Sequence, residues 1–434
     1  MKTLIKGKWL IHNMELKEDW GIVINDSVIE SVGPLKDLQG DYDEVIDRTS
    51  QMIAPGFVNG HMHMYGVLSH GITAEALVTE FSSFLEDFWW PYVENRIDHD
   101  LIKTTTKWAC IEMIDSGITS FMDVLEAPNA LPGALKVAST EVEKSGLRAV
   151  LSFEACERVS KENGELGLDE NIEFAQSKGA DSLVQGAMSI HTLFTASEEF
   201  IKKAKRMADD NNLSFHMHLS ESVYEPSEVM KKYQKTPVEV YRDWGVLDEN
   251  VFASQVVQVS DGEIDLIGKS NMRAVSMPLS NCEVGGGVAP VEKLLKKNVS
   301  VGLGTDGYIN NFFEVMRGAF LIHKAYQQDP QAMPAETVYD MATRMGAISM
   351  GLNKVGELKE GYLADLITID IDTPTPINKH NVFDQLILFR NPNNVRDVFV
   401  NGKKLKEDGI ICSMDVEGSK KELRKATNQF WGVE

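Results

Sequence analysis

The chain has 434 residues, of which 43% are hydrophobic, and its 65 aspartates and glutamates outnumber its 43 lysines and arginines to give a formal net charge of -22. This length and apolar content suffice for one large hydrophobic core and a smaller one. The negative charge opposes binding to nucleic acid or to an anionic membrane surface, and no apolar run reaches the roughly 18 residues that a membrane-spanning helix needs.

The cysteines and the first residues of the chain indicate in which cellular compartment the protein is expected. The four cysteines are scattered and form no Cys-x-x-Cys pair: Cys110, Cys156, Cys282 and Cys412. This pattern indicates neither a disulfide framework nor a cysteine-type zinc site. The first residues, MKTLIKGKWLIHNMELKED, lack the long apolar segment and small-residue cleavage site of a signal peptide. We therefore expect a cytoplasmic protein.

Both ends of the chain are predicted to be rich in β-strands. Short alternating runs near the start, TLIKGKWLI, WGIVINDSVIESVG and YDEVIDRT, are separated by turn signals. A similar pattern returns late in GYLADLITIDID and VRDVFVNGKKL, which contains an Asn-Gly turn. We expect one small β-sandwich domain composed of residues 1–55 and 356–434, the second part ending in a helix.

Strand-like and helix-like stretches alternate between these two ends. The segment 100–116, for example, has apolar residues at helical spacing and stops at Gly117. Eight strand-helix units in about 300 residues predict a (β/α)₈ barrel over residues 56–355 rather than an open sheet. The strand candidates are 52–60, 118–124, 147–153, 183–190, 213–219, 251–257, 272–277 and 299–305.

Two histidines in the first barrel strand, FVNGHMHMYG, suggest a metal site. His61 and His63 alternate, and side chains at alternate positions of a strand point to the same side. On this stretch alone, a metal site and a polar strand end with two surface histidines both remain open. The strand-end pattern favours the metal site, because the carboxyl ends of barrel strands converge on one place.

Two further strand ends carry suitable ligands. The fifth, HMHLSES, contains His216, His218 and Glu221, and the eighth, GLGTDG, contains Asp306. Three histidines and one aspartate would form an N₃O site that suits Zn²⁺, with Fe²⁺ or Mn²⁺ as alternatives.

The motifs FVNGHMH, HLSE, SNCEVGGGVAPV and VGLGTDGYINN resemble those of the amidohydrolase superfamily. They are most similar to the branch of S-adenosylhomocysteine/methylthioadenosine deaminases and triazine chlorohydrolases, and the resemblance extends over nearly the whole chain. It implies a hydrolase of carbon–nitrogen bonds other than peptide bonds that deaminates an aminated heterocycle, such as a nucleoside, purine or pterin. It also implies one divalent metal per chain, a metal-bound hydroxide as nucleophile, a small-molecule substrate and a homo-oligomer.

The resemblance also assigns roles to residues. The glutamate that follows the strand-five ligand by three positions favours His218 over His216, which would then be a deeper core histidine. Glu221 would move a proton from water to the leaving nitrogen, and Asp306 would accept a proton from the same water. The implied metal ligands are His61, His63, His218 and Asp306.

One position departs from the family pattern. Where the family has a histidine at the end of strand six, the segment ASQVVQV places Gln255. An amide donates and accepts hydrogen bonds but carries no charge, and an uncompensated loss costs about 2–4 kcal/mol of transition-state stabilisation. Two alternatives to an ordinary deaminase therefore stay open: a triazine-type chlorohydrolase or N-dealkylase, and a weakly catalytic binding protein.

Substrate contacts are implied at three positions of the same branch. They are His191 in SIHTLFTAS, Glu94 in WWPYVENRID and Arg148 in GLRAVL. The structural alternatives are a strand-end polar residue, a carboxylate on a helix surface and a salt bridge at the barrel rim. An aromatic cluster near Glu94 is open to either ring stacking or core packing: Phe84, Phe88, Trp89, Trp90 and Tyr92.

Overall fold

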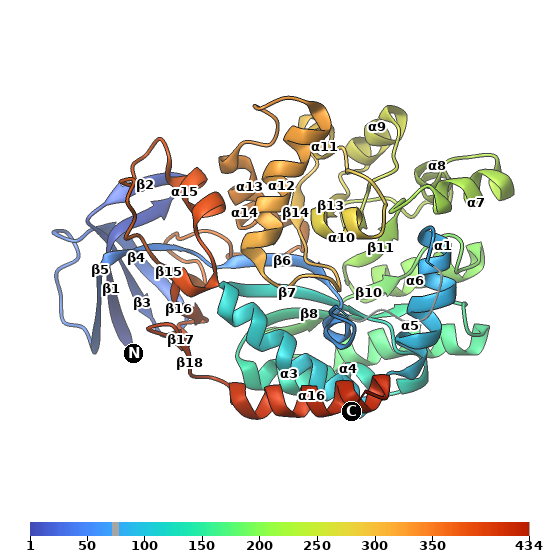
Figure 1. Cartoon of the computed structure of the whole chain (residues 1–434), viewed down its shortest axis with the longest axis horizontal. Coiled ribbons are helices and arrows are strands. Elements are labelled where there is room, and N and C mark those ends of the chain that lie inside the picture. The colour runs from blue at the N-terminus through green and yellow to red at the C-terminus, as the bar shows by residue number, and fades with distance from the viewer. Residues whose placement is uncertain (72–77, 434) are drawn as a thin grey trace.

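The computed structural model describes residues 1–71 and 78–433 and contains two sheets (Figure 1). Eight parallel strands form a barrel, which closes where β10 pairs with β8. The predicted (β/α)₈ barrel is therefore confirmed. Its strands are β6 (Phe57–Met62), β7 (Ile118–Leu125), β8 (Arg148–Ala155), β10 (Met188–Ile190), β11 (Phe215–Leu219), β12 (Val251–Gln255), β13 (Arg273–Ser276) and β14 (Val301–Leu303). A short strand, β9 (Val184–Gly186), extends the sheet beside β8.

Helices follow the barrel strands and cover the barrel from outside (Figure 1). The predicted helix at 100–116 is α3 (His99–Ser116). It begins at Asp98, whose carboxylate accepts from the Leu101 N–H at 2.9 Å, and ends at Gly117 with φ +86°. The other main helices of this layer are α4 (Ala134–Ser145), α5 (Lys161–Gln176), α6 (Glu198–Asp210), α7 (Tyr224–Tyr233), α8 (Pro237–Asp243), α9 (Asp261–Ser270), α10 (Pro278–Glu283), α11 (Val291–Lys296), α12 (Phe312–Gln327), α13 (Ala335–Met341) and α14 (Arg344–Ser349).

The second sheet combines both ends of the chain, as predicted, and forms a separate domain. Its order is β18-β17-β16-β15-β5-β1-β3-β4, with β2 beside β1. The early strands are β1 (Lys2–His12), β2 (Glu15–Glu18), β3 (Trp20–Asn25), β4 (Val28–Pro34) and β5 (Glu44–Pro55). The late strands are β15 (Leu366–Asp370), β16 (Val395–Val400), β17 (Lys403–Glu407) and β18 (Ile410–Ile411). The predicted domain boundaries at residues 55 and 355 stay predictions.

The strand predicted at 52–60 is in fact two strands in two different sheets. β5 ends at Pro55 and β6 begins at Phe57, so Gly56 is the junction between the domains. A Cβ on Gly56 would lie 2.2 Å from the Thr119 side chain, so the chain needs a glycine to pass this point. Hydrophobic periodicity alone does not reveal such a change of sheet.

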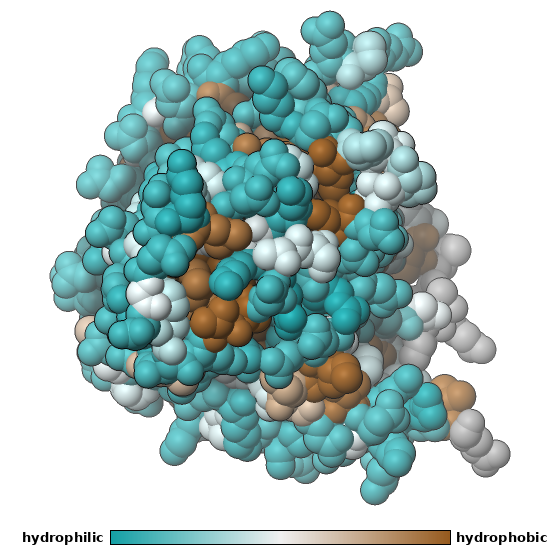
Figure 2. All heavy atoms as spheres, turned by 90° about the vertical axis from the view of Figure 1, so that its left-hand side faces the viewer, coloured by the Kyte–Doolittle hydropathy of each residue, from teal (hydrophilic) through white to brown (hydrophobic). Residues whose placement is uncertain are grey.

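The C-terminal helix α16 (Val416–Trp431) packs along α3 on the outside of the barrel (Figure 1). The Trp431 indole N–H donates to the Leu68 carbonyl at 2.7 Å, which ties the end of the chain to the short helix η1 (Met64–Leu68) just after β6. Within residues 1–71 and 78–433, none of the helices combines the length and apolarity needed to cross a membrane. The face in Figure 2, on the side of the small sheet, is mostly hydrophilic with separate hydrophobic patches.

Candidate active site

The predicted histidines meet at the carboxyl end of the barrel, inside a layer of apolar side chains. His61 lies on β6 and His218 on β11, and His63 follows β6 directly. Their ligand nitrogens lie within 4.8 Å of one another, and all three side chains are buried. Asp306, just after β14, completes the group: its Oδ1 is 3.3 Å from His63 Nε2 and 3.9 Å from His61 Nε2.

Backbone contacts hold these ligands in place. The N–H groups of Thr305 and Asp306 both donate to the His61 carbonyl at 3.1 Å, which joins the ends of β6 and β14. Gly304 makes this approach possible, because a Cβ there would lie 2.7 Å from the same carbonyl oxygen. His63 Nδ1 donates to the Val124 carbonyl at 2.6 Å, so that its Nε2 is left for the site.

The donor set fits a divalent metal. Both ring nitrogens of His61 are buried and have no hydrogen-bond partner among the described residues, and a metal ion at Nε2 would supply one. Burial, together with the neighbouring His218 and His63, holds the pKa of His61 well below its usual value, so its ring is neutral and able to bind a metal. Burial raises the pKa of Asp306, but His63 and His61 outweigh this effect and bring it below its usual range.

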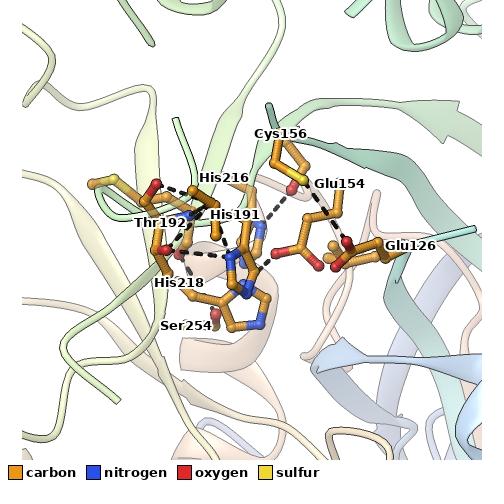
Figure 3. A network of polar contacts seen from close by, with 12 residues as sticks. Glu126, Glu154, Cys156, His191, Thr192, His216, His218 and Ser254 are labelled. Atoms are coloured by element: carbon orange, nitrogen blue, oxygen red, sulfur yellow. Dashed lines mark hydrogen bonds and ion pairs between the residues drawn. The ribbon is translucent and has the colours of Figure 1, made fainter. Parts of the chain in front are cut away.

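His216 occupies a deeper position on β11 than His218. Its ring is stacked on His61 with centroids 5.1 Å apart and lies 5.1 Å from the Phe252 ring in the barrel interior. His216 Nδ1 is 2.8 Å from Ser189 Oγ. His218, and not His216, therefore lies beside the Glu154 carboxylate (Figure 3).

Gln255 is placed directly against Asp306 at the end of β12. Its Nε2 donates to Asp306 Oδ2 at 2.7 Å, and Ser280 Oγ donates to the same oxygen at 2.7 Å. The Asn281 amide in turn donates to Gln255 Oε1. These contacts fix Oδ2 and leave Oδ1 of Asp306 facing the histidines. Gln255 therefore orients a ligand, which is a positioning role.

Three strand ends around the site adopt left-handed backbone conformations that side chains normally avoid. Gln255 has φ +77°, Val256 +51°, Asp306 +59° and Ser220 +51°. Each such residue costs on the order of 1–3 kcal/mol, and valine is especially unusual in this region. The surrounding structure therefore holds the site in a strained arrangement.

Glu221 follows β11 and lines the cavity above the metal ligands. Removal from bulk water, and then the negative charge of Asp306, raises the pKa of Glu221 to about 8. A carboxyl with a pKa near neutrality both accepts and releases protons readily. The turn that carries Glu221 is fixed by Glu225, whose carboxylate accepts from the N–H groups of Ser220 at 2.6 Å and Leu193 at 3.1 Å.

A cavity of about 720 Å³ opens over this group. Part of its wall is aromatic: Phe84, Phe88 and Trp89 line it from the π-helical segment η2 (Phe84–Trp89). Trp90 and Tyr92, from the same predicted cluster, do not line it. Tyr308 contributes from the loop after β14. The wall is suited to stacking against a planar ring.

Two of the three predicted substrate contacts reach the cavity. His191, after β10, lines it and is held by Thr195 Oγ1 at 3.0 Å from Nδ1. Glu94 lines it from the short helix η3 (Glu94–Arg96) and is 3% exposed. Glu94 accepts from Tyr65 Oη at 3.0 Å and from Arg158 Nη2 at 3.0 Å.

The prediction for Arg148 is wrong, because this residue lies at the opposite end of the barrel. It is the first residue of β8, and the cavity lies beyond the last residue, roughly 20 Å further along an eight-residue strand. Its guanidinium binds Asp365 through two contacts, Nε–Oδ2 at 2.7 Å and Nη2–Oδ1 at 3.1 Å. Arg148 therefore joins the barrel to the small domain.

Replacing Arg148 with methionine is expected to lower stability without affecting substrate binding. Asp365 is 2% exposed, so the change leaves an uncompensated buried charge and costs about 3 kcal/mol of unfolding free energy. Urea unfolding measures the loss, and KM should stay within twofold of the wild type. The double variant Arg148→Met/Asp365→Asn should recover part of the stability. A large rise in KM with unchanged stability would instead show that Arg148 contributes to substrate binding.

Sequence analysis missed two glutamates that line the cavity and the arginine that pairs with one of them. Glu126 follows β7 and Glu154 lies near the end of β8, and the two are adjacent because Leu125 pairs with Phe153 in the register just before them. Arg158 donates to Glu126 Oε1 from Nε at 2.8 Å and from Nη2 at 2.6 Å. The rule that found Asp306, a charged residue at the carboxyl end of a barrel strand, applies equally to both glutamates.

Glu154 extends the carboxylate group to the metal ligands. Its Oε1 lies 2.7 Å from His218 Nδ1 (Figure 3). Burial lowers the pKa of His218, but Glu154 outweighs this effect and raises it to about 9. The Glu154 carboxylate therefore stabilises positive charge on the His218 ring.

Comparison with known proteins finds one matching family and several similar enzymes. Residues 52–405 match the Amidohydrolase family. The chain is 33% identical over 411 residues to a 5-methylthioadenosine/S-adenosylhomocysteine deaminase of Thermococcus sibiricus, an alignment that covers 93% of each chain. It is 30% identical over 416 residues to a 5'-deoxyadenosine deaminase of Methanosphaera stadtmanae, covering 94% of this chain and 95% of that protein.

Solved structures share the fold. An adenosine deaminase from Xanthomonas campestris with bound zinc superposes with a TM-score of 0.90 at 22% identity over 99% of each chain. An atrazine chlorohydrolase from Arthrobacter aurescens complexed with zinc gives a TM-score of 0.86 at 21% identity, over 98% of this chain and 100% of that one. The barrel and the small domain thus recur together in these structures.

Proposed function

Because the chain belongs to the amidohydrolase family and is a hydrolase of carbon–nitrogen bonds other than peptide bonds, we propose that it deaminates a 5'-modified adenine nucleoside. The observation that carries this proposal is the placement of Glu221 beside the histidine and aspartate group, under an aromatic wall. The names of the two relatives that align over nearly their whole length support the adenine nucleoside.

Different residues of the chain carry out different steps of the proposed reaction. The aromatic wall orients the planar ring, and Glu221 takes a proton from the attacking water as its oxygen bonds to the amino-bearing carbon. Glu221 then gives this proton to the leaving nitrogen, so that ammonia departs and the ring carbon becomes a carbonyl. Asp306, oriented by Gln255 and Ser280, is able to accept the other proton of the water, which ends on the ring nitrogen beside the new carbonyl.

We propose that one zinc ion per chain is held by His61, His63, His218 and Asp306. Zinc in the related fold with adenosine deaminase activity supports this choice. A zinc ion there would act as a Lewis acid and make water a better nucleophile near neutral pH. Fe²⁺ and Mn²⁺ remain alternatives that the same donor atoms accept.

Metal content and ammonia release test the proposal together. We expect elemental analysis to find about one zinc per chain, and we expect ammonia from 5'-deoxyadenosine or methylthioadenosine. Guanine, a pterin and atrazine serve as comparison substrates in the same assay. Zinc without ammonia from any adenine nucleoside would overturn the substrate, and absence of any metal after reconstitution would overturn the site.

Two other interpretations predict different products. A chlorohydrolase would release chloride from atrazine, but a chloride leaving group needs no proton, and Glu221 is placed to deliver one. A binding protein without turnover was suggested by Gln255 alone, and the structure gives that residue a complete set of contacts. Both interpretations are therefore less well supported than deamination.

The remaining expectations concern the surroundings of the enzyme. The substrate is a small molecule that fits a cavity of about 720 Å³. The cysteines of the described chain are all free thiols, which supports a reducing compartment such as the cytoplasm. The homo-oligomer stays a prediction.

A further inference from the structure

The charged groups around the cavity are strongly unbalanced. Carboxylates line it from several elements, whereas no lysine or arginine lines it within residues 1–71 and 78–433. Two of these carboxylates at the mouth are satisfied: Glu112 accepts from Trp108 and Asn310, each at 2.8 Å, and Asp115 pairs with Lys406. The others face a space that a substrate enters.

The deepest part of this negative wall is formed by Glu94, Glu126 and Glu154, which we call the glutamate wall. Their exposures are 3%, 2% and 2%, so bulk water does little to screen them. The guanidinium of Arg158 forms ion pairs with both Glu94 and Glu126. Arg158 approaches from behind and is itself covered by the Trp90 ring at 4.7 Å.

The glutamate wall also contains carboxylate oxygens that contact no lysine or arginine of the described chain. Glu154 is buried, and its charged partner is His218, whose Nδ1 lies 2.7 Å from Oε1. Glu126 receives both Arg158 donors on Oε1, and Cys156 Sγ lies 3.7 Å from the same oxygen (Figure 3). The other oxygen of Glu126 is therefore left for a donor from a ligand.

Metal binding does not remove the imbalance. A divalent ion would be balanced by Asp306 and one further carboxylate, and Arg158 balances one member of the glutamate wall. Glu221 and Glu283 have no basic partner within the described chain, and Glu283 is the last residue of α10, where the helix dipole adds negative potential. Burial, together with neighbouring carboxylates, raises the pKa of Glu94 well above its usual value and the pKa of Glu221 to about 8, so a proton is favoured on both until a cation approaches. The cavity of the described chain therefore offers several acidic groups to a cation or a hydrogen-bond donor, and no lysine or arginine to an anion.

We propose that this cavity selects substrates whose substituent is cationic, and that it rejects substrates whose substituent is anionic. The inference rests on the proposed deamination and specifies its substrate. A phosphate or carboxylate on the nucleoside would enter the negative wall with no cation to receive it. An ammonium would be attracted by the glutamate wall and by the aromatic rings beside it.

Three adenine nucleosides of nearly equal size test the proposal: 5'-deoxyadenosine, 5'-amino-5'-deoxyadenosine and adenosine 5'-carboxylate. They place a methyl, an ammonium or a carboxylate at the same point, and ammonia release gives kcat/KM for each. We expect the ammonium compound to exceed the methyl compound by about tenfold and the carboxylate to fall at least tenfold below it. The spread should narrow as salt is added.

Glu126→Gln identifies the source of the selectivity. The change keeps the size of the side chain and removes one charge from the glutamate wall, so the ammonium-to-methyl ratio should fall severalfold. Glu143→Gln is the matched control, because Glu143 pairs with Lys178 on the surface and does not line the cavity. It removes the same charge from the protein and should leave the ratio within twofold.

The outcomes separate the two proposals. If none of the three compounds releases ammonia, the deaminase assignment fails. If all three are deaminated with equal kcat/KM, or if the carboxylate is preferred, the charge selectivity is overturned while deamination stands. If the ratio persists in Glu126→Gln, the glutamate wall is not its source.

Discussion

Glu221→Gln is expected to lower kcat by roughly 10²–10⁴-fold while the metal stays bound. Glutamine has the size of glutamate and still forms hydrogen bonds, but it neither takes a proton from water nor gives one to the leaving nitrogen. None of the four proposed metal ligands is changed. Steady-state ammonia release measures the first effect, and elemental analysis measures the second.

The control for this variant is a glutamate on the surface of the helix that follows Glu221. Glu228 on α7 forms a surface ion pair with Lys231, so Glu228→Gln removes the same charge outside the cavity and should keep kcat within about twofold. If Glu221→Gln keeps wild-type turnover, the proton-transfer mechanism is wrong. If it loses the metal, the variant has disturbed the site, and Glu221 acts structurally.

Gln255→Glu is expected to lower metal affinity and kcat by about 10–100-fold. The new carboxylate would replace the amide donor that lies 2.7 Å from Asp306 Oδ2, and two like charges would then meet in a buried place. The loss should diminish as pH falls, because a protonated carboxyl is again a donor. The measurement is zinc affinity together with the pH profile of kcat/KM, compared with the same profile of the wild type.

The histidine of the family pattern is the informative second variant. We expect Gln255→His to bring no gain, because the amide already donates to Asp306 and accepts from Asn281. A rise in kcat/KM would instead show that the glutamine impairs the enzyme. A variant that simply unfolds is recognised by its circular dichroism and can be replaced by Gln255→Asn, which keeps the amide but shortens its reach.

The barrel, and the meeting of the histidines with Asp306 at one end of it, could be predicted because each depends on local patterns. Strand periodicity gave the strand positions, and the shared carboxyl end of parallel strands brought His61, His218 and Asp306 together. The switch of sheet at Gly56 could not be predicted, since the apolar run continues through it. It depends on contacts with Thr119, far along the chain.

Residues whose roles depend on long-range partners were harder to assign. The family resemblance predicts a substrate contact at Arg148. Its partner Asp365 instead lies 217 positions later, in the small domain. Gln255 was recognised as unusual, but its contact with Asp306 emerges only when the ends of β12 and β14 are assembled. Glu126 and Glu154 stand at strand ends, but their partners Arg158 and His218 come from other segments, so their place at the site depends on the assembled barrel.

The small domain has a consequence for how the protein is made. Ile53 of β5 pairs with Thr368 of β15. More than 300 further residues must therefore be synthesised before the β5 edge can pair with β15. At ordinary translation speed that wait is on the order of tens of seconds, during which an apolar strand edge is open to wrong partners. The strands of the barrel are synthesised while both halves of the small sheet are still apart. Loss of the last eighty residues would therefore do more than shorten the protein: it would leave the first fifty permanently without the strands that complete them.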